Sequence, residues 1–116
     1  MSSPTTISVE KLARLVGTPH CPALIDVRND EDFALDPRLI PGSQRRSHLD
    51  VLDWSSQFVG GSAIVICHKG LKLSHGTAAW LRHRGIPSDS LEGGFEAWIS
   101  AGLPTVPFAK LPRRNR

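Results

Sequence analysis

A cysteine stands at the point where an apolar segment gives way to a loop of glycine and cations. Residues 63–67 read AIVIC, and Lys69, Gly70 and Lys72 follow within five positions. A thiol attacks as the thiolate, which is favoured by nearby cations and by the N-terminus of a helix. Gly70 lets the loop amides turn inward as an anion cradle, and the two lysines add full positive charges. The pattern therefore predicts a nucleophilic Cys67 that needs no general base.

The other loop residues add hydrogen-bond donors or exclude water. His68 and His75 are further donors, and Leu71 and Leu73 are expected to desolvate the mouth of a pocket. The structural alternative is an inert thiol, because cysteine is among the most buried residue types. The glycine and the cations before a helix favour the reactive interpretation. A Cys-His protease would need an orienting group and an oxyanion hole, and neither can be assigned. The chemistry that fits is attack of sulfur on sulfur, with an anionic leaving group.

Strands and helices alternate in the elements expected to position this loop. Apolar, β-branched segments predict buried strands at residues 23–27 and 63–67, and a weaker one at 88–92. Apolar spacing and capping residues predict helices at residues 9–16, 48–58, 74–84 and 94–102. The acidic segment 29–35 is expected to form a turn. The alternation favours an α/β fold with a central, mostly parallel sheet flanked by helices.

Polar residues follow each of the three predicted strands. They occupy positions 26–28, 67–69 and 92–94. In a parallel sheet the carboxyl ends of the strands share one edge, where ligands collect. We therefore expect these three segments to meet at a site beside Cys67.

Length and composition limit the class of protein. The 116 residues fit one domain, expected over residues 1–107, followed by a basic tail at 108–116. The longest apolar run, residues 63–67, is far shorter than the roughly 20 residues of a membrane helix, so no membrane partner is expected. The N-terminal sequence shows no secretory signal, which leads us to expect a cytoplasmic protein.

The charge and the cysteines exclude further classes. Much of the excess behind the net charge of +3 lies in the tail, which is more typical of a solvated chain end than of a nucleic-acid-binding arm. No nucleic acid partner is therefore expected. Cys21 and Cys67 are 46 positions apart, which matches neither a disulfide framework nor a zinc-site spacing. No metal ligand set is expected, and Cys21 is interpreted as a structural thiol.

Several segments resemble the rhodanese family of sulfurtransferases. LEGGFEAW at 91–98 and AGLP at 101–104 are similar to the closing segment of that family. LIDVR at 24–28 resembles one of its strands, and IPGS at 40–43 resembles one of its turns. The resemblance runs from about residue 7 to residue 104. It implies a rhodanese-like fold and a persulfide mechanism.

The resemblance also implies roles for the loop. Cys67 would take sulfane sulfur from a donor such as thiosulfate, release sulfite, and pass the sulfur to cyanide or a thiol. The amides from His68 to Leu73, with Gly70 and Leu71 between them, would stabilise the thiolate and the persulfide. Lys69 and Lys72 would attract the anionic donor. No cofactor is implied. The implied partners are a small sulfur donor, a thiol acceptor and a sulfur-relay protein.

Two features of the sequence leave alternatives open. Arg28 is a further candidate for substrate binding, although an Asp26–Arg28 pair that braces the strand end is favoured. The loop also departs from the family pattern C-x-x-G-x-(R/K)-S, because Leu73 takes the place of the serine and Ser74 follows one position later.

The longer loop brings related enzymes into consideration. Cysteine phosphatases and arsenate reductases of this fold use a lengthened loop to hold a tetrahedral oxyanion, closed by arginine in a C-x5-R motif. Leu73 occupies that arginine position and cannot make the bidentate contact. Sulfur transfer is therefore expected over phosphate or arsenate chemistry. A non-catalytic rhodanese-like interaction module is the third alternative.

Overall fold

A parallel five-stranded sheet forms the centre of the chain. The computed structural model describes residues 5–108. Within them the strands lie in the order β1-β6-β5-β2-β4, and each neighbouring pair is parallel. Their bounds are Thr6–Ile7 for β1, Ala23–Asp26 for β2, Ser43–Arg45 for β4, Ala63–Ile66 for β5 and Ser88–Leu91 for β6. The predicted α/β fold with a central, mostly parallel sheet is confirmed.

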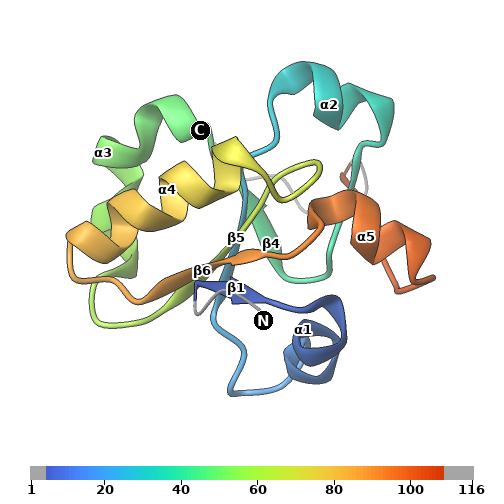
Figure 1. Cartoon of the computed structure of the whole chain (residues 1–116), viewed down its shortest axis with the longest axis horizontal. Helices are drawn as coiled ribbons and strands as arrows, with labels where there is room; N and C mark the ends of the chain where they lie inside the picture. The colour runs from blue at the N-terminus through green and yellow to red at the C-terminus, as the bar shows by residue number, and fades with distance from the viewer. Residues whose placement is uncertain (1–4, 109–116) are drawn as a thin grey trace.

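Helices cover both faces of this sheet. On one face lie α1 (Val9–Leu15) and α5 (Gly94–Ser100), and on the other lie α3 (Val51–Trp54) and α4 (Lys72–His83). Figure 1 shows α3 and α4 together on one side of the sheet and α1 on the opposite side. Across residues 5–108, no helix combines the length and the apolarity that crossing a bilayer requires.

The central strand β5 is buried on both faces. Its side chains alternate, so that Ile64 and Ile66 join the apolar cluster under α1 and α5, while Val65 joins the cluster under α4. Cys67, the next residue, belongs to the α4 side by the same alternation. The register of β5 therefore directs this thiol toward the N-terminal end of α4.

The acidic segment forms a helix, α2 (Asp30–Leu35), where the sequence predicted a turn. That expectation was wrong because Asn29 is an N-cap: its Oδ1 accepts a hydrogen bond from the Asp32 backbone N–H at 2.7 Å. Three acidic residues occupy the first turn, where the helix dipole favours negative charge.

Other element boundaries also differ from expectation. The helix α4 begins at Lys72, two residues before the predicted start. The helix expected at 48–58 is divided into η1 (His48–Asp50), α3 and η2 (Ser55–Phe58). The strands β1 and β4 were not predicted, nor were β3 (Arg38–Leu39) and β7 (Val106–Pro107), which form a separate antiparallel pair. Apart from Phe108, the expected tail at 108–116 lies outside the described residues.

Candidate active site

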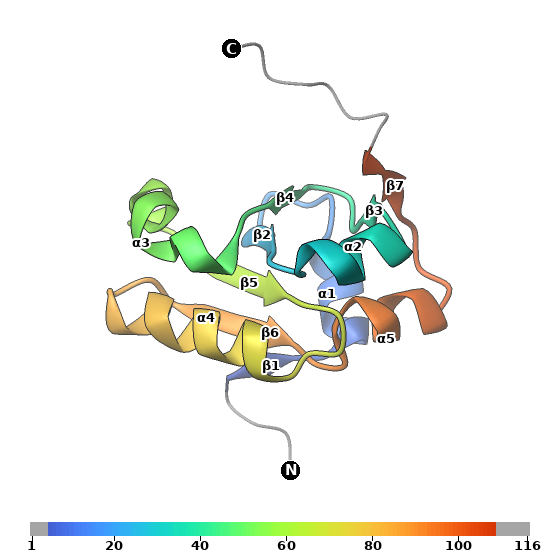
Figure 2. The same cartoon turned by 90° about the horizontal axis from the view of Figure 1, so that it is seen from above.

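The carboxyl ends of the central strands meet at one edge of the sheet. The strand β5 pairs in parallel with β2 and with β6, so all three end in the same direction. Figure 2 shows the arrows of β5 and β6 pointing the same way, toward α2 and α5. The three polar segments at the strand ends therefore share this edge, as expected, and Cys67 leaves the middle strand of the three.

The loop after Cys67 is fixed from outside by the first turn of α5. The Phe95 backbone N–H donates to Cys67 O at 2.8 Å, and that of Glu96 donates to His68 O at 2.9 Å. No peptide bond within residues 5–108 is cis, and a trans peptide directs its N–H opposite to its C=O. The N–H groups of His68 and Lys69 therefore point away from α5.

Two glycines allow the loop and α5 to approach this closely. Gly70 has φ +71°, and a Cβ there would lie 2.6 Å from Leu91 O. Gly94 has φ +65°, and a Cβ there would lie 2.5 Å from Cys67 O. Both positions combine a left-handed backbone with contact against another backbone, which only glycine tolerates. The second glycine of the LEGG segment thus packs against the same loop that contains Gly70.

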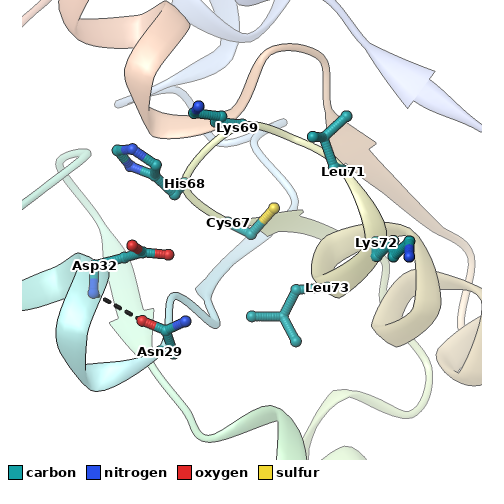
Figure 3. A pocket seen from close by; sticks show the side chains of 8 residues that line it. All are labelled: Asn29, Asp32, Cys67, His68, Lys69, Leu71, Lys72 and Leu73. Atoms are coloured by element: carbon teal, nitrogen blue, oxygen red, sulfur yellow. Dashed lines mark hydrogen bonds between the residues drawn. The ribbon is translucent and has the colours of Figure 1, made fainter.

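The loop amides are available to an anion. Within residues 5–108, no hydrogen-bond acceptor is found for the backbone N–H groups of residues 68–74. Leu71 occupies the N-cap of α4 and has no side chain that could cap the helix. The first amides of this 12-residue helix, with its dipole, are therefore directed at the loop. Figure 3 shows the Cys67 sulfur pointing into the ring that the loop forms.

Ser74 is a site residue that the sequence analysis did not assign. Its Oγ lies 3.1 Å from Cys67 Sγ and 3.4 Å from Leu71 O. Ser74 is fully buried, and Cys67 is 4% exposed. The hydroxyl can accept from the thiol while donating to Leu71 O, or rotate to donate to the thiolate. The serine that stands one position late in the sequence therefore still reaches the sulfur.

A pocket of about 640 Å³ opens over Cys67. Besides Cys67 it is lined by five residues of the predicted substrate-binding set, namely His68, Lys69, Leu71, Lys72 and Leu73. Gly70, from the same set, does not line this pocket and instead packs against the backbone of residues 91–94. The loop composition thus places cations and leucines around the thiol.

The polar side chains of the loop differ in their surroundings. Lys69 and Lys72 are exposed and form no ion pair within the described part of the chain. The His68 Nε2 atom lies 3.8 Å from Glu96 Oε2, while its Nδ1 is buried without a hydrogen-bond partner among residues 5–108. The lysines can therefore attract an anion at long range, and His68 offers a polar atom inside the wall of the pocket.

The structure does not bring Arg28 to this pocket. Its buried guanidinium pairs with Asp26, with Nη2 2.9 Å from Oδ2, and donates to the backbone oxygens of Asp36 and Arg38. It also stacks 3.9 Å from the Phe95 ring centroid. These contacts occupy the guanidinium as a brace between the end of β2 and its neighbours, which was the favoured alternative for this residue.

The opposite wall of the pocket was missed. It consists of Asn29 and Asp32, which belong to the start of α2. Figure 3 shows α2 facing α4 across the pocket. The spacing Asn-x-x-Asp is a helix-capping signal that could have revealed α2, but its position over Cys67 depends on tertiary packing.

The second thiol has different surroundings. Cys21 does not line the Cys67 pocket, and both cysteines are free. Burial raises the pKa of the Cys21 thiol, so the thiolate is disfavoured there at neutral pH. The pKa shift agrees with the interpretation of Cys21 as a structural residue.

Three solved structures are similar to this chain in fold. Thiosulfate sulfurtransferase from Pseudomonas aeruginosa matches with a TM-score of 0.75 and 28% identity, over 91% of this chain and 20% of that one. A rhodanese-related protein from Thermoplasma volcanium matches with a TM-score of 0.74 and 22% identity, over 87% and 96% of the two chains. A Rhodopseudomonas palustris protein described as a possible tyrosine phosphatase matches with a TM-score of 0.73 and 24% identity, over 85% and 82%.

The last two similarities, at this level of identity, show the fold alone. No curated protein sequence matches the chain significantly. The sequence model of the Rhodanese-like domain matches residues 8–101, which is most of the chain and includes the Cys67 loop and α5. On this evidence the chain belongs to the rhodanese-like domain family.

Proposed function

We propose that the protein is a sulfurtransferase in which Cys67 carries sulfane sulfur as a persulfide. The observation that supports this best is the position of the Cys67 sulfur, 3.1 Å from the Ser74 hydroxyl and inside a loop of amides that lack acceptors within residues 5–108. Such a loop stabilises a thiolate and a persulfide anion alike. The 28% identity to a thiosulfate sulfurtransferase agrees with this function.

The reaction divides into two sulfur transfers. In the first, the Cys67 thiolate attacks the outer sulfur of thiosulfate; a Cys67–S–S⁻ persulfide forms, the S–S bond of the donor breaks, and sulfite leaves with the bonding electron pair. In the second, an acceptor thiolate or cyanide takes the outer sulfur and returns Cys67 to the thiolate. Loop amides and the Ser74 hydroxyl would offset the negative charge on sulfur in both steps. Lys69 and Lys72 would draw the donor dianion into the pocket.

Phosphatase or arsenate reductase activity is the second candidate because a similar structure is described as a possible tyrosine phosphatase. Leu73 argues against it, since this side chain lines the pocket where an oxyanion-binding arginine would be needed. Lys72 supplies a point charge without a bidentate fork. The third candidate, an interaction module without catalysis, predicts no persulfide at all.

The partners follow from the chemistry. We propose a small anionic sulfur donor and a thiol acceptor, which can be a small molecule or a cysteine of a sulfur-relay protein. The exposure of Leu71, 61% at the edge of the pocket, supports docking of a protein acceptor there. Location in the cytoplasm stays a prediction.

The decisive experiment follows the mass of the intact protein after incubation with thiosulfate. We expect the protein to gain the mass of one sulfur atom, to lose it on addition of cyanide, and to carry it on the peptide that contains Cys67. Cys21→Ala should load normally and Cys67→Ala should not load. Label on Cys21, or no label, would contradict the proposal. Hydrolysis of an aryl phosphate that Cys67→Ser abolishes would favour the phosphatase instead.

A further inference from the structure

One charged group in the Cys67 pocket has no role in the reaction as described so far. Asp32 lines the pocket from α2 and is half-buried. Within residues 5–108 its carboxylate forms neither an ion pair nor a hydrogen bond. Other aspartates at this end of the molecule are paired, with Asp26 bound to Arg28 and Asp30 to Arg45. Asp32 therefore presents an unpaired negative charge to the pocket that contains Cys67.

This carboxylate is held in place by its own helix. Asn29 Oδ1 accepts from the Asp32 backbone N–H at 2.7 Å, which fixes the first turn of α2. Figure 3 shows the Asp32 carboxylate on the pocket side of α2. Lys69 and Lys72 line the same pocket from the loop and the start of α4. The pocket therefore carries charges of both signs.

A dianionic donor gains nothing from Asp32. The negative charge of Asp32 repels thiosulfate when both lie in the same pocket. Only the lysines and the loop amides attract this donor. A carboxylate facing the nucleophile suits a ligand with positive charge. The second substrate, the thiol that removes the sulfur, is the one whose charge the reaction leaves open.

We propose that Asp32 selects thiol acceptors that carry an ammonium group close to their sulfur. The inference rests on the proposed sulfur transfer. The acceptor thiolate attacks the outer sulfur of the Cys67–S–S⁻ persulfide; a new S–S bond forms, the bond to Cys67 Sγ breaks, its electron pair stays on Cys67 as the thiolate, and the negative charge of the outer sulfur leaves with the acceptor persulfide. The product is the acceptor persulfide, and no oxidant or reductant is consumed. Asp32 binds the ammonium group during this attack, and a carboxylate on the same acceptor would face Lys69 or Lys72.

The ammonium group also serves the chemistry. A positive charge a few bonds from a thiol favours its thiolate, which is the form that attacks. An aminothiol therefore brings a larger thiolate fraction to the pocket at neutral pH than a thiol with a nearby carboxylate. Asp32 adds recognition of the same charge.

The test compares three small acceptors of similar size and different charge. Cysteamine carries an ammonium group, 2-mercaptoethanol is neutral, and 3-mercaptopropionate carries a carboxylate. Protein loaded with thiosulfate is mixed with each acceptor, and loss of the Cys67 persulfide is followed by quenched intact-mass measurements. Rates are divided by the thiolate concentration of each acceptor at the assay pH. Wild type is compared with Asp32→Asn, which removes the charge and keeps the size.

We expect Asp32→Asn to slow discharge by cysteamine about tenfold, as loss of one close charge pair would. Discharge by 2-mercaptoethanol should change less than about twofold, and discharge by 3-mercaptopropionate should become faster. Asp32→Glu keeps the charge and should retain the preference for cysteamine. Glu31→Gln removes a charge from the adjacent, exposed position, which does not line the pocket, and should leave all three rates within about twofold.

The outcomes separate this inference from the proposed function. If wild type takes up no sulfur from thiosulfate, sulfur transfer and the acceptor preference both fail. If wild type and Asp32→Asn load normally but Asp32→Asn changes the three discharge rates equally, only the acceptor preference fails. The same conclusion follows if Glu31→Gln reproduces the effect, because the charge would then act as part of a general field.

Discussion

At the scale of single residues, the buried hydroxyl of Ser74 is a hydrogen-bond partner of the Cys67 sulfur. Ser74 Oγ lies 3.1 Å from Sγ and can donate a strong hydrogen bond to it once the thiol ionises, because a neutral thiol sulfur is a weak acceptor. Before ionisation the same hydroxyl accepts from the thiol and donates to Leu71 O, 3.4 Å away. Ser74 thus has a partner in both protonation states, and its donor favours the thiolate over the thiol.

Ser74→Ala should therefore slow the chemistry of Cys67 without changing the fold. Loss of a hydrogen bond to a charged group costs about 1.5–3 kcal/mol, so we expect persulfide formation and alkylation by iodoacetamide at pH 7 to fall at least about tenfold. Thr77→Ala is the matched control, because Thr77 lies one turn later in α4 and its hydroxyl, among residues 5–108, bonds only to Leu73 O. Equal rates in the two variants would show that Ser74 has no role at the sulfur.

We predict that Lys72 acts on the thiosulfate donor more than on the Cys67 thiol. Its exposed ammonium lines the pocket without an ion pair among residues 5–108. Lys72→Ala should raise KM for thiosulfate about two- to fivefold, which corresponds to an exposed charge pair, and should change alkylation by neutral iodoacetamide less. Added salt should shrink the difference in KM.

Lys11→Ala is the control for Lys72, since Lys11 is exposed on α1 and does not line the pocket. An equal loss in the thiosulfate and iodoacetamide assays would assign Lys72 to stabilisation of the thiolate instead.

At the scale of elements, the Cys67 loop and the N-terminus of α5 form one unit. The amides of Phe95 and Glu96 bind the carbonyls of Cys67 and His68, so these two groups of backbone atoms satisfy each other. The Cys67 loop and α5 are far apart in sequence. The loop follows β5 and α5 follows β6, so the parallel pairing of these two strands brings the start of the loop close to the start of α5. The start of α5 therefore constrains the shape of the Cys67 loop.

Gly94→Ala should disrupt this unit. Its backbone has φ +65°, which costs a non-glycine residue about 1–3 kcal/mol, and the new Cβ would meet Cys67 O at 2.5 Å. We expect the free energy of unfolding, measured in urea, to fall by at least that amount, and persulfide formation to fall with it.

Two other glycines serve as controls for Gly94. At Gly102 the φ is +72° but a Cβ would meet nothing within 4 Å, so Gly102→Ala should show the conformational cost alone. At Gly76, inside α4, a Cβ also meets nothing within 4 Å, and alanine should stabilise by about 0.5–1 kcal/mol. A loss of stability at Gly94 no larger than at Gly102, with normal loading, would contradict the close contact with the loop.

The sequence predicted the elements with strong periodicity and missed those defined by partners. The buried strands β2 and β5 and the capped helix α1 follow from apolar runs and from Ser8, whose Oγ accepts from Lys11 N. The short strands β1 and β4 have too few residues to show a period, and their pairing is set by β6 and β2. The Cys67 loop was found from its composition, whereas the places of Asp32 and Ser74 depend on packing that no local pattern encodes.

At the scale of the whole molecule, one buried cation joins parts of the chain that the sheet does not connect. Arg28 pairs with Asp26 at the end of β2, donates to the carbonyls of Asp36 and Arg38, and stacks on Phe95 of α5. The segment after α2 is thereby held against the edge of the sheet that carries the pocket. Its conformation is also supported by an ion pair of its own, with Arg38 Nε 2.6 Å from Asp36 Oδ1.

The Asp36–Arg38 pair makes the stability of the whole domain depend on pH. The hydrogen bond from Arg38, assisted by its charge, holds the pKa of Asp36 below its ordinary value. A carboxyl group with a lowered folded pKa stabilises the native state above its unfolded pKa, about 3.9, and this contribution is lost as the pH falls through the folded pKa. Asp36→Asn should therefore lower Tm at pH 7, by at most about 4 °C for a partly exposed pair, and the difference from wild type should vanish in acid. Thermal melts followed by circular dichroism between pH 2 and 7 measure this difference in Tm.

The control removes the partner first. In an Arg38→Gln background, Asp36→Asn should have little effect on Tm at any pH. A pH-dependent loss of Tm that persists without Arg38 would mean that another group stabilises the carboxylate.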